Sequence, residues 1–364
     1  MRIRNIMKLY LVGGFLGSGK TTAIYQAAAS LLKQEKHIAV ITNDQGDELV
    51  DTHYIKTAGV PTKEIINGCF CCNYNQFMQA INSPLPGGEP EIILAESVGS
   101  CADLVATIAK PMAKFRPEIQ LVISIFADAQ LLHSLITCNA SFLDENVRYI
   151  YKKQLEEADL LIVNKVDLLN EAELRTVKKE IETGYAGKTV IYQNSLAETS
   201  VRNWVLELDR FGIQKERKSL QIDYDRYAKG EAILGWLDLR IRVKTKDFSA
   251  HSVARKFIQE VYSTIKETQN PIAHLKFLLD DGLQHQKISF TTLDPESTEL
   301  PFVDKKVNKV LILVNARIQA DAVEVEKLVS DLIEKIARQT NSQIIVEKKA
   351  AFQPGYPKPT HRIS

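Results

Sequence analysis

A glycine-rich segment near the start of the chain places the strongest constraint on its fold. Residues 14–21 read Gly-Phe-Leu-Gly-Ser-Gly-Lys-Thr and fit the pattern G-x-x-x-x-G-K-[S/T]. The segment follows the apolar run Lys8–Val12 and precedes a helical pattern over Thr22–Lys33. A strand, a glycine-rich loop and a helix in this order form a phosphate-binding loop. We therefore expect a nucleotide-binding domain of the α/β class.

The chemistry of phosphate binding explains each residue type in this loop. Glycines let the backbone N–H groups surround a phosphate chain, and the N-terminus of the following helix adds positive partial charge. Lys20 is expected to reach the β- and γ-phosphates as a catalytic cation, and the Thr21 hydroxyl is expected to ligate Mg²⁺. The residues predicted to bind the nucleotide here are Gly14, Gly17, Ser18, Gly19, Lys20, Thr21 and Thr22. The alternative, a turn without a ligand, is disfavoured by the strand–loop–helix context.

Apolar runs alternate with helical patterns up to about residue 200. The predicted strands are Lys8–Val12, Ile38–Thr42, Glu91–Ala95, Leu121–Phe126, Leu160–Val163 and Val190–Tyr192. The helical patterns between them include Thr22–Lys33, Asn146–Glu157 and Glu171–Thr183. Several strands are nearly unbroken runs of Val, Ile and Leu, as in strands buried on both faces. The alternation predicts a P-loop NTPase fold over residues 1–210, with a doubly wound, mainly parallel sheet.

A polar and basic stretch over residues 211–230 indicates a linker to a second domain, predicted over residues 231–350. Strands are predicted at Trp236–Val243, Ala273–Leu279, Lys287–Thr292, Val310–Asn315 and Gln343–Glu347. Helices are predicted at Ser252–Thr268 and Asp321–Arg338. We interpret the order as β-α-β-β-α-β, that of a smaller α+β ferredoxin-like domain. The proline-containing tail from Phe352 is expected to be irregular.

A second motif suggests which base is bound. Residues 164–167 read Asn-Lys-Val-Asp, directly after a predicted strand, and fit N-K-x-D. An Asp carboxylate can accept hydrogen bonds from N1–H and the exocyclic amine of guanine, whereas adenine presents the opposite polarity. The predicted base-contacting residues are Asn164, Lys165, Asp167 and Ser195. The last of these lies in a loop after another strand, where an ordinary turn is an equal alternative.

Acidic residues at two other strand ends are candidates for metal and water binding. Glu96 follows the strand Glu91–Ala95, where a carboxylate is suited to hold Mg²⁺, and Gly99 is placed to sense the γ-phosphate. A solvated glutamate is the alternative. Residues 43–47 read Asn-Asp-Gln-Gly-Asp and make Asp44 a catalytic candidate near the metal or the attacking water. Asn, Asp and Gly are also what a tight turn requires, so a turn is a serious alternative.

Three cysteines lie within four positions, in the segment Gly-Cys-Phe-Cys-Cys over residues 68–72. Thiolates are soft ligands that favour Zn²⁺ or Cu(I). In an extended segment Cys69 and Cys71 project to the same side, and Cys72 needs a local twist to join them. Three sulfurs leave one tetrahedral position open, which suits a site that releases its metal. Buried free thiols or a redox pair are the alternatives. Two isolated cysteines are expected to be core residues: Cys101 and Cys138.

Charge and hydropathy exclude several classes of protein. A formal net charge of +1 over 364 residues gives no electrostatic reason to expect a nucleic acid or an anionic membrane as partner. No apolar stretch approaches the roughly 18 residues that span a bilayer, and the first residues lack a signal-peptide core. The odd number of cysteines disfavours a secreted disulfide framework. We expect a cytoplasmic protein.

With G-F-L-G-S-G-K-T-T, G-C-F-C-C, E-S-V-G and N-K-V-D in this order, the chain resembles the CobW family of GTPases. These are relatives of the nickel-insertion GTPases UreG and HypB, and the resemblance covers the first 200 residues. It implies a metallochaperone that binds Mg·GTP, hydrolyses it slowly at the β–γ phosphoanhydride and couples this to transfer of a metal, commonly Zn²⁺. The metal-associated residues that it implies are Cys69, Cys71 and Cys72 for the transferred ion, and Thr21 and Glu96 for Mg²⁺.

The resemblance further implies that GTP orders residues 43–48 and 67–73 to form the metal site, and that hydrolysis releases the ion. The implied partners are an unidentified metalloenzyme or cofactor-enzyme client and a second copy in a homodimer. Two departures stand out. The chain has no histidine-rich run, and the family's Asn-Glu-Phe-Gly-Glu is Asn-Asp-Gln-Gly-Asp here, which leaves the roles of Asp44 and Asp47 open.

Two other functions compete with this interpretation. The first is a GTPase that assembles or reactivates a corrinoid (cobalamin-type) or other cofactor-dependent enzyme, with a structural cysteine site. The second is a small-molecule kinase, which N-K-x-D argues against. The dependence of metal occupancy on the bound nucleotide separates the metallochaperone from the first alternative.

Overall fold

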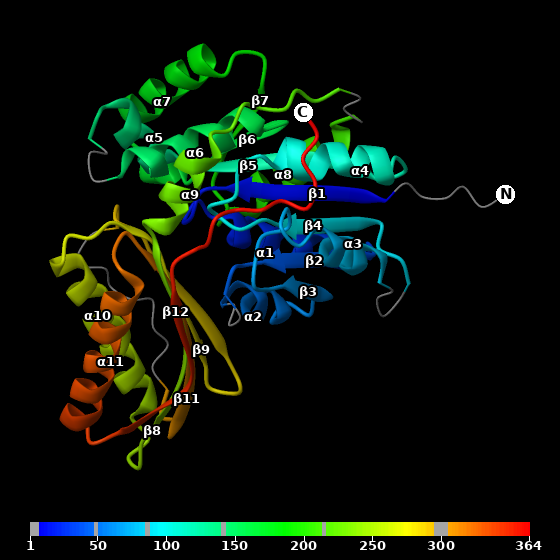
Figure 1. Ribbon diagram of the computed structural model, residues 1–364. Helices are drawn as coiled ribbons and strands as arrows, with labels where there is room; N and C mark the ends of the chain where they lie inside the picture. Colours follow the sequence, from blue (N-terminus) through cyan, green and yellow to red (C-terminus); the bar gives the residue numbers. More distant parts are fainter. Residues whose placement is uncertain (1–6, 47–49, 84–87, 140–142, 213–215, 295–304) are drawn as a thin grey trace. The chain divides into compact units, whose positions relative to one another are not determined.

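The computed structural model describes residues 7–46, 50–83, 88–139, 143–212, 216–294 and 305–364. The chain divides into two compact units, drawn together in Figure 1. Unit 1 comprises the residues up to Gln45, Ala58–Gly230 and Pro357–Ser364, and unit 2 comprises Gly46–Thr57 and Glu231–Tyr356. The chain therefore leaves unit 1 twice and returns to it twice.

Unit 1 is built on a seven-stranded sheet with the order β3-β2-β4-β1-β5-β6-β7. All neighbouring strands are parallel. The strands are β1 (Lys8–Gly14), β2 (Ile38–Asn43), β3 (Thr62–Ile65), β4 (Ile92–Glu96), β5 (Gln120–Asp128), β6 (Leu160–Asn164) and β7 (Thr189–Gln193). Strands β2, β4 and β6 are buried throughout, which explains their unbroken apolar sequences. The predicted parallel sheet of a P-loop fold is confirmed.

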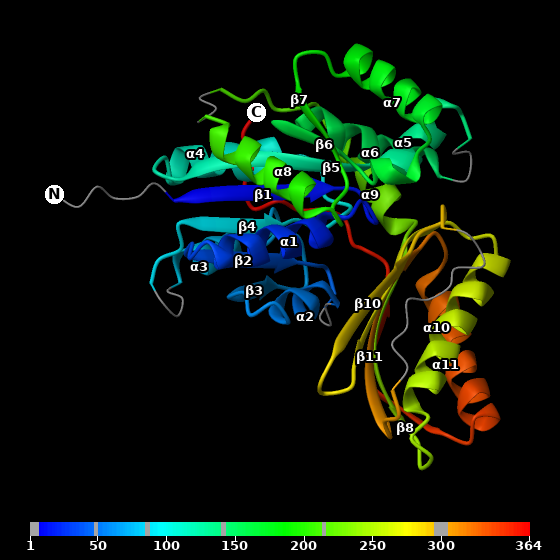
Figure 2. The same cartoon turned by 180° about the vertical axis from the view of Figure 1, so that it is seen from behind.

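Helices flank both faces of this sheet: α4 and α6 lie in front of it in Figure 1, and α1 and α8 in Figure 2. The helices are α1 (Lys20–Lys33), α3 (Tyr74–Asn82), α4 (Lys110–Phe115), α5 (Ala129–Ile136), α6 (Glu145–Glu157), α7 (Glu171–Gly184), α8 (Glu198–Arg210) and α9 (Tyr224–Ala232). Two short turns, η1 (Val105–Ala109, π-helical) and η2 (Val166–Leu168, 3₁₀), complete the unit. A capping box between Asn170 and Glu173 starts α7 where the sequence predicts it.

Unit 2 contains an antiparallel sheet with the order β10-β9-β11-β8-β12. Its elements are β8 (Gly235–Lys244), α10 (Ala250–Glu267), β9 (Ile272–Asp280), β10 (His285–Phe290), β11 (Lys309–Ile318), α11 (Ala322–Gln339) and β12 (Gln343–Phe352). Without β10, the chain order is the expected β-α-β-β-α-β. Strand β10 is an addition at the edge, paired with β9.

The two faces of this sheet have different partners. Along β11, Ile312, Val314 and Ala316 belong to the core that α10 and α11 form with the sheet. Residues between them point the opposite way, because side chains alternate along a strand. On that second face Leu313 packs with Leu278 and Val50. Val50 begins α2 (Val50–Lys56), which contacts β9, β10 and β11.

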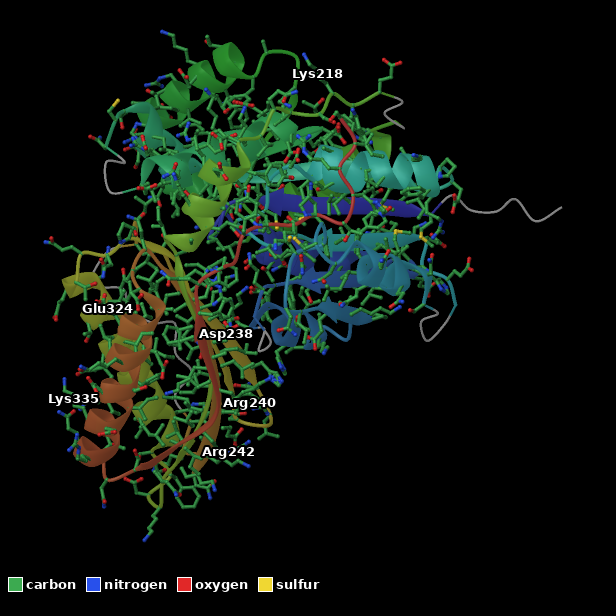
Figure 3. All side chains as sticks on the ribbon, viewed as in Figure 1. Lys218, Asp238, Arg240, Arg242, Glu324 and Lys335 are labelled. Atoms are coloured by element: carbon green, nitrogen blue, oxygen red, sulfur yellow. The ribbon has the colours of Figure 1, made fainter. Side chains whose placement is uncertain are left out.

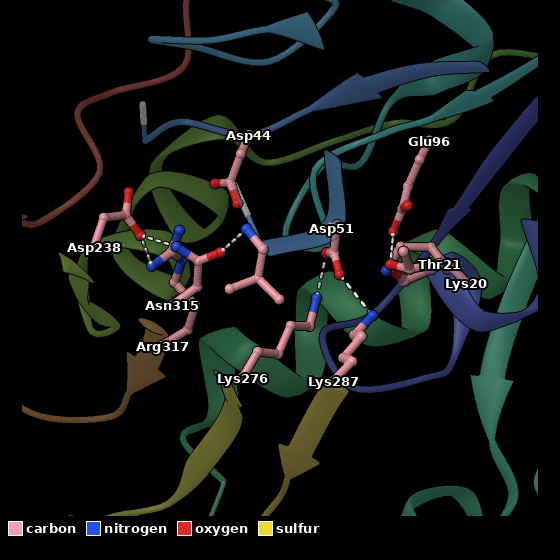
Figure 4. A network of polar contacts seen from close by, with 12 residues as sticks. Lys20, Thr21, Asp44, Asp51, Glu96, Asp238, Lys276, Lys287, Asn315 and Arg317 are labelled. Atoms are coloured by element: carbon pink, nitrogen blue, oxygen red, sulfur yellow. Dashed lines mark hydrogen bonds and ion pairs between the residues drawn. The ribbon is translucent and has the colours of Figure 1, made fainter. Parts of the chain in front are cut away.

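A buried polar network attaches the start of α2 to the same face (Figure 4). Arg317 and Asp238 form an ion pair of 2.7 Å, and both side chains are almost fully buried. Asn315 donates to Asp238 at 2.7 Å and accepts from the Val50 N–H at 2.8 Å. Gly46 lies so close to Asp238 that a Cβ there would be 1.5 Å from the carboxylate. Gly46 and helix α2 are therefore an integral part of unit 2.

The remaining surfaces of unit 2 carry exposed ion pairs (Figure 3). Lys335 of α11 pairs with Glu260 of α10 at 2.9 Å. Arg240 and Arg242 of β8 both pair with Glu347, which stands at a β-bulge of β12. Strand β12 continues five residues beyond its predicted end, and the tail after it is irregular as expected. None of the helices described has both the length and the apolar character to cross a membrane.

Candidate functional site

The phosphate-binding loop connects β1 to α1 at the carboxyl end of the parallel sheet, where ligands of such folds bind. Gly14 has a φ of +121°, and a Cβ there would lie 2.1 Å from the Phe126 carbonyl oxygen. Gly19 has a φ of +90°, and a Cβ there would lie 2.3 Å from the Asn164 amide. Side chains are excluded at both positions, so the backbone keeps the open curvature that phosphate binding requires.

Lys20 and Thr21 begin α1 and are both buried. The Lys20 ammonium donates to the carbonyl of Gly14 at 2.7 Å, so it lies over the loop. The Thr21 hydroxyl donates to Glu96 Oε1 at 2.9 Å, as Figure 4 shows. The predicted pair thus meets across the ends of β1 and β4. A hydroxyl and a carboxylate are hard oxygen donors, so these two residues fit Mg²⁺.

Two further predicted residues lie in the loops after β4 and β2. Gly99 approaches the phosphate-binding loop so closely that a Cβ would lie 2.6 Å from Leu16 Cδ2. Asp44 follows β2, and its Oδ1 accepts from the Gln45 N–H at 2.7 Å. That bond joins neighbouring residues, and Gln45 and Gly46 form a bend after it. Asp47 lies outside the described residues.

The guanine-motif residues gather at the ends of β6 and β7. Asn164 donates to the Ser18 carbonyl at 2.8 Å and accepts from the Ser195 hydroxyl at 2.8 Å. It therefore joins the phosphate-binding loop to the loop after β7. Lys165 has a left-handed backbone, with a φ of 64°, and pairs with Asp128 at 2.7 Å. Asp167 lies in η2 immediately afterwards.

Most of the predicted polar side chains of the nucleotide site are buried, namely those of Ser18, Thr21, Asn164 and Ser195. Gly17 and Thr22 complete the predicted loop, Gly17 with a φ of 76°.

The cysteine segment forms a turn, so the expectation of an extended segment is wrong. The N–H groups of Cys72 and Asn73 both donate to the Cys69 carbonyl, at 3.1 and 2.9 Å, and α3 begins directly afterwards. Gly68 precedes the turn with a φ of +141°. The turn brings the sulfurs of Cys69, Cys71 and Cys72 within 4.8 Å of one another. No other group of three metal-ligating side chains occurs in the part of the chain that the structure describes.

Asn43, at the carboxyl end of β2, holds this turn in place. Its amide donates to the carbonyls of Ile65 and Gly68, at 3.0 and 2.7 Å. Its carbonyl oxygen accepts from the Phe70 N–H at 2.9 Å. The sequence indicated Asn43 only as a turn residue. The end of β2 and the cysteine turn are therefore connected by one buried side chain.

Cys101, in the loop after β4, is buried and contributes to the same cluster. Hydrogen bonds join its sulfur to those of Cys69 and Cys71. The pKa of Cys69 is held well below its usual range, chiefly by the bond with Cys101 and then by those with Cys71 and Cys72. Conversely, the pKa of Cys71 lies well above its usual range, chiefly because of its bond with Cys101. Cys138 is exposed, so the expectation of a core residue is wrong there.

The tail Pro357–Ser364 lies against the cluster. The backbone N–H of Lys358 bonds to the Cys72 sulfur. Thr360 donates its N–H to the Cys71 carbonyl at 2.8 Å and its hydroxyl to the Cys72 carbonyl at 2.9 Å. Beyond it, Arg362 pairs with Asp103 at 2.7 Å. Nothing in the irregular tail sequence indicated these contacts.

Comparisons with known proteins show which family has this combination of motifs. Residues 8–192, half of the chain, match the family model "CobW/HypB/UreG, nucleotide-binding domain". The chain is 31% identical over 160 residues to zinc chaperone YeiR of Escherichia coli, a match that covers 43% of this chain and 46% of YeiR. It is 26% identical over 214 residues to zinc chaperone CobW of Sinorhizobium sp., covering 52% of this chain and 59% of that protein. It is 30% identical over 179 residues to zinc chaperone YjiA of Escherichia coli, covering 46% of this chain and 52% of YjiA.

The matched region thus spans about half the length of these relatives. The family model covers every strand of the parallel sheet except the last residue of β7, together with the phosphate-binding loop, the cysteine turn and the N-K-x-D segment. By sequence and by the arrangement of these motifs, the chain belongs to the CobW/HypB/UreG family of P-loop GTPases.

Proposed function

We propose that this protein is a GTP-dependent metallochaperone that binds Zn²⁺ at the cysteine turn and transfers it to a metalloenzyme client. The observation that carries the proposal is the bridge formed by Asn43 between the end of β2 and the cysteine turn. A change at the nucleotide site that moves the end of β2 moves the cysteine turn with it. The names of the matched relatives, zinc chaperones, support Zn²⁺ as the cargo.

At the nucleotide site, Asn164 and Asp167 would bind guanine, and Ser195 would close over the base. The N–H groups of the loop and Lys20 would bind the phosphates and stabilise the charge that develops on them. Thr21 and Glu96 would hold Mg²⁺, which supplies further positive charge to the phosphates. Hydrolysis breaks the β–γ phosphoanhydride by attack of water on the γ-phosphorus.

Asp44 is proposed to orient that water, although its Oδ1 accepts from the N–H of its neighbour Gln45. In this proposal that bond breaks when GTP binds, and Asp44 and Gly99 then report the γ-phosphate to the cysteine turn. Loss of phosphate restores the bond and loosens the metal site, an order–disorder switch of the kind known for GTPases. A homodimer is part of the proposal and is tested by sedimentation in each nucleotide state.

The test is a titration of Zn²⁺ against a competing chelator, with Mg·GDP and with Mg·GTP analogue that cannot be hydrolysed. We expect binding to be tighter with the GTP analogue by roughly 5- to 150-fold, the usual range of allosteric coupling. Cys71→Ser should abolish that binding, and Cys138→Ser, an exposed cysteine outside the cluster, should leave it unchanged. Equal affinity in both nucleotide states would show that the metal site is structural.

A further inference from the structure

The sulfur cluster extends beyond the three cysteines of the turn. Cys101 comes from the loop after β4, 29 positions after Cys72, and is 1% exposed. Its sulfur is hydrogen-bonded to those of Cys69 and Cys71. The sulfurs of the turn are 2.7 Å apart for Cys69 and Cys71, and 3.4 Å apart for Cys69 and Cys72. The sulfur of Cys101, from a second loop, therefore adjoins two of the three sulfurs of the turn.

We propose that Cys101 is the fourth ligand of the metal site, so that the bound cation has a tetrahedral shell of four sulfurs. The inference rests on the proposed function only in taking the cysteine turn as a metal site. A Zn–S distance of about 2.3 Å in a tetrahedron separates the sulfurs by about 3.8 Å. The cation would therefore spread Cys69 and Cys71 slightly and draw Cys72 and Cys101 toward each other.

A core role explains Cys101 less well than a ligand role. An isolated buried cysteine usually packs among aliphatic side chains as a small apolar residue. Here its sulfur meets the sulfurs of Cys69 and Cys71 instead. In the described part of the chain no further histidine, cysteine or carboxylate lies within 4.8 Å of all three sulfurs of the turn, but Cys101 reaches two of them. Cys101 is thus the available side chain of the right softness for the position that three sulfurs leave open.

The surroundings supply what a four-thiolate site needs. A divalent cation with four thiolates carries net negative charge, which hydrogen bonds from backbone N–H groups to sulfur can stabilise. Two such donors are present: the N–H of Cys72 bonds to the Cys69 sulfur, and the N–H of Lys358 bonds to the Cys72 sulfur.

The placement of Cys101 gives the shell two separate supports. Three sulfurs lie on the turn held by Asn43, whereas the fourth lies five residues after Glu96 and two after Gly99. Withdrawal of the loop after β4 removes one sulfur and leaves an open, three-sulfur shell. An open shell can accept a ligand from a client, whereas a closed one cannot. Cys101 therefore acts as the closing ligand of the site.

The test compares Cys101→Ser with Cys138→Ser in the full chain, using Co²⁺ and Zn²⁺ as probes. With Co²⁺ we expect the sulfur-to-metal charge-transfer absorbance to fall by about one quarter in Cys101→Ser, since one of four thiolates is lost. Zinc affinity should fall by at least about 10-fold, the lower end of what even an outer-shell change costs. Cys138→Ser should match the wild-type protein in both measurements. Equality of Cys101→Ser with the wild type would overturn the proposal.

Two measurements on the wild-type protein apply even if Cys101→Ser fails to fold. X-ray absorption of the zinc-loaded protein should give four sulfur neighbours, and zinc should protect Cys101 from alkylation mapped by mass spectrometry. A zinc site with three sulfurs and one lighter neighbour would overturn the proposal and leave the proposed metallochaperone function intact. So would alkylation of Cys101 in the folded, zinc-loaded protein at the same rate as in the zinc-free protein. Absence of any zinc binding by the wild-type protein would overturn both.

Discussion

At the residue scale, single buried side chains in unit 1 connect loops that are distant in sequence. Asn164 joins the phosphate-binding loop to the loop after β7, and Asn43 joins the end of β2 to the cysteine turn. An amide can do this because it has a donor and an acceptor on one short side chain. Each of these hydrogen bonds fixes one loop relative to another. Replacing either asparagine with alanine should therefore let the two loops that it joins move independently.

Asn43→Ala should therefore weaken the dependence of zinc affinity on the nucleotide. The variant loses three hydrogen bonds, to Ile65, Gly68 and Phe70. We expect the affinity ratio between GTP analogue and GDP to fall toward one, with a loss of about 1–3 kcal/mol in stability. Asn73→Ala is the matched control. The Asn73 side-chain amide makes a long, exposed hydrogen bond of 3.5 Å to the Asn67 carbonyl, in place of the three bonds of Asn43. A full affinity ratio in Asn43→Ala would contradict the coupling role.

Glu157 should make stability depend on pH. Burial raises the pKa of its carboxyl to about 8, although the Val105 N–H donates to it at 2.9 Å. The unfolded carboxyl ionises near pH 4.3, so the unfolded state binds fewer protons between that pH and about 8. The free energy of unfolding should fall as pH rises through this window, by up to about 1.4 kcal/mol per pH unit.

Glu157→Gln should remove this contribution. In urea titrations between about pH 5 and about pH 8, the variant should gain stability relative to the wild type by up to about 1.4 kcal/mol per pH unit. Glu156→Gln, at the neighbouring and more exposed carboxylate, is the control. Parallel pH profiles for the wild type and Glu157→Gln would show that the buried carboxyl does not titrate in this range.

How far the sequence predicts the site depends on how each residue acts. Residues that bind through a local motif, such as Lys20 and Asn164, are visible because the motif spacing reflects one loop and one ligand. Cys101 gives no such signal. Its partners are 29 or more positions away, and only the fold brings the loops after β3 and β4 together. A polar or sulfur-bearing residue just beyond a buried parallel strand was the available hint.

At the element scale, the predictions succeed for long, strongly patterned segments and fail for short ones. The central strands and the helices α1, α6, α7, α10 and α11 are all anticipated, with small differences at their ends. Strand β3 was missed because its sequence, Thr-Lys-Glu-Ile, is polar and lies at the sheet edge. Helix α2 was missed because its seven residues are fixed by packing on β9 and β11 rather than by helical periodicity.

The attachment of α2 depends on Asp51, which pairs with Lys276 of β9 and Lys287 of β10 (Figure 4). Burial opposes ionisation of Asp51, but the two ammonium groups outweigh it and hold the pKa of Asp51 well below its usual range. The depressed folded pKa means that this stabilisation is present above about pH 4, the unfolded value, and is lost as pH falls below it.

Asp51→Asn leaves two largely buried ammonium groups without their charge partner. We expect a loss of about 3 kcal/mol in the free energy of unfolding at pH 7, measured by urea denaturation, and a smaller loss at pH 3. Glu260→Gln breaks the exposed pair with Lys335 and should cost less than about 1 kcal/mol. Equal effects of the two substitutions would show that Asp51 does not anchor α2.

At the scale of the whole molecule, the last residues of the described chain belong to the unit in which it began. After completing the sheet of unit 2, the chain returns as Pro357–Ser364 to lie beside the cysteine turn. Thr360 bonds to both Cys71 and Cys72, and the Ile363 N–H bonds to the Ala106 carbonyl at 2.9 Å. Because the Lys358 N–H also bonds to the Cys72 sulfur, we expect the tail to limit the access of solvent and oxidants to that sulfur.

Removal of residues 357–364 should expose the cluster. In the metal-free protein we expect faster alkylation of Cys72, measured by mass spectrometry, because the covering backbone and the Lys358 N–H are lost. Zinc affinity should fall by about 10-fold, because the hydrogen bond from the Lys358 N–H to the Cys72 sulfur is lost. A chain lacking only Ser364 is the control. An unchanged alkylation rate after removal of the whole tail would show that the tail does not cover the site.

Unit 2 consists of two separate stretches of the chain, which limits how its gene can be recombined or re-engineered. Unit 2 is interleaved with unit 1, because residues 46–57 complete its sheet face and the tail returns from it. Gene fusion at a single junction would transfer neither unit intact. A replacement of unit 2 by that of a relative would have to carry α2 with it, and the donor's residues at Gly46, Asn315 and Asp238 would have to match. Amino-acid changes in unit 2 should therefore be correlated with changes in a short stretch of the first 60 residues. In a chimaeric protein the two stretches should be exchanged together.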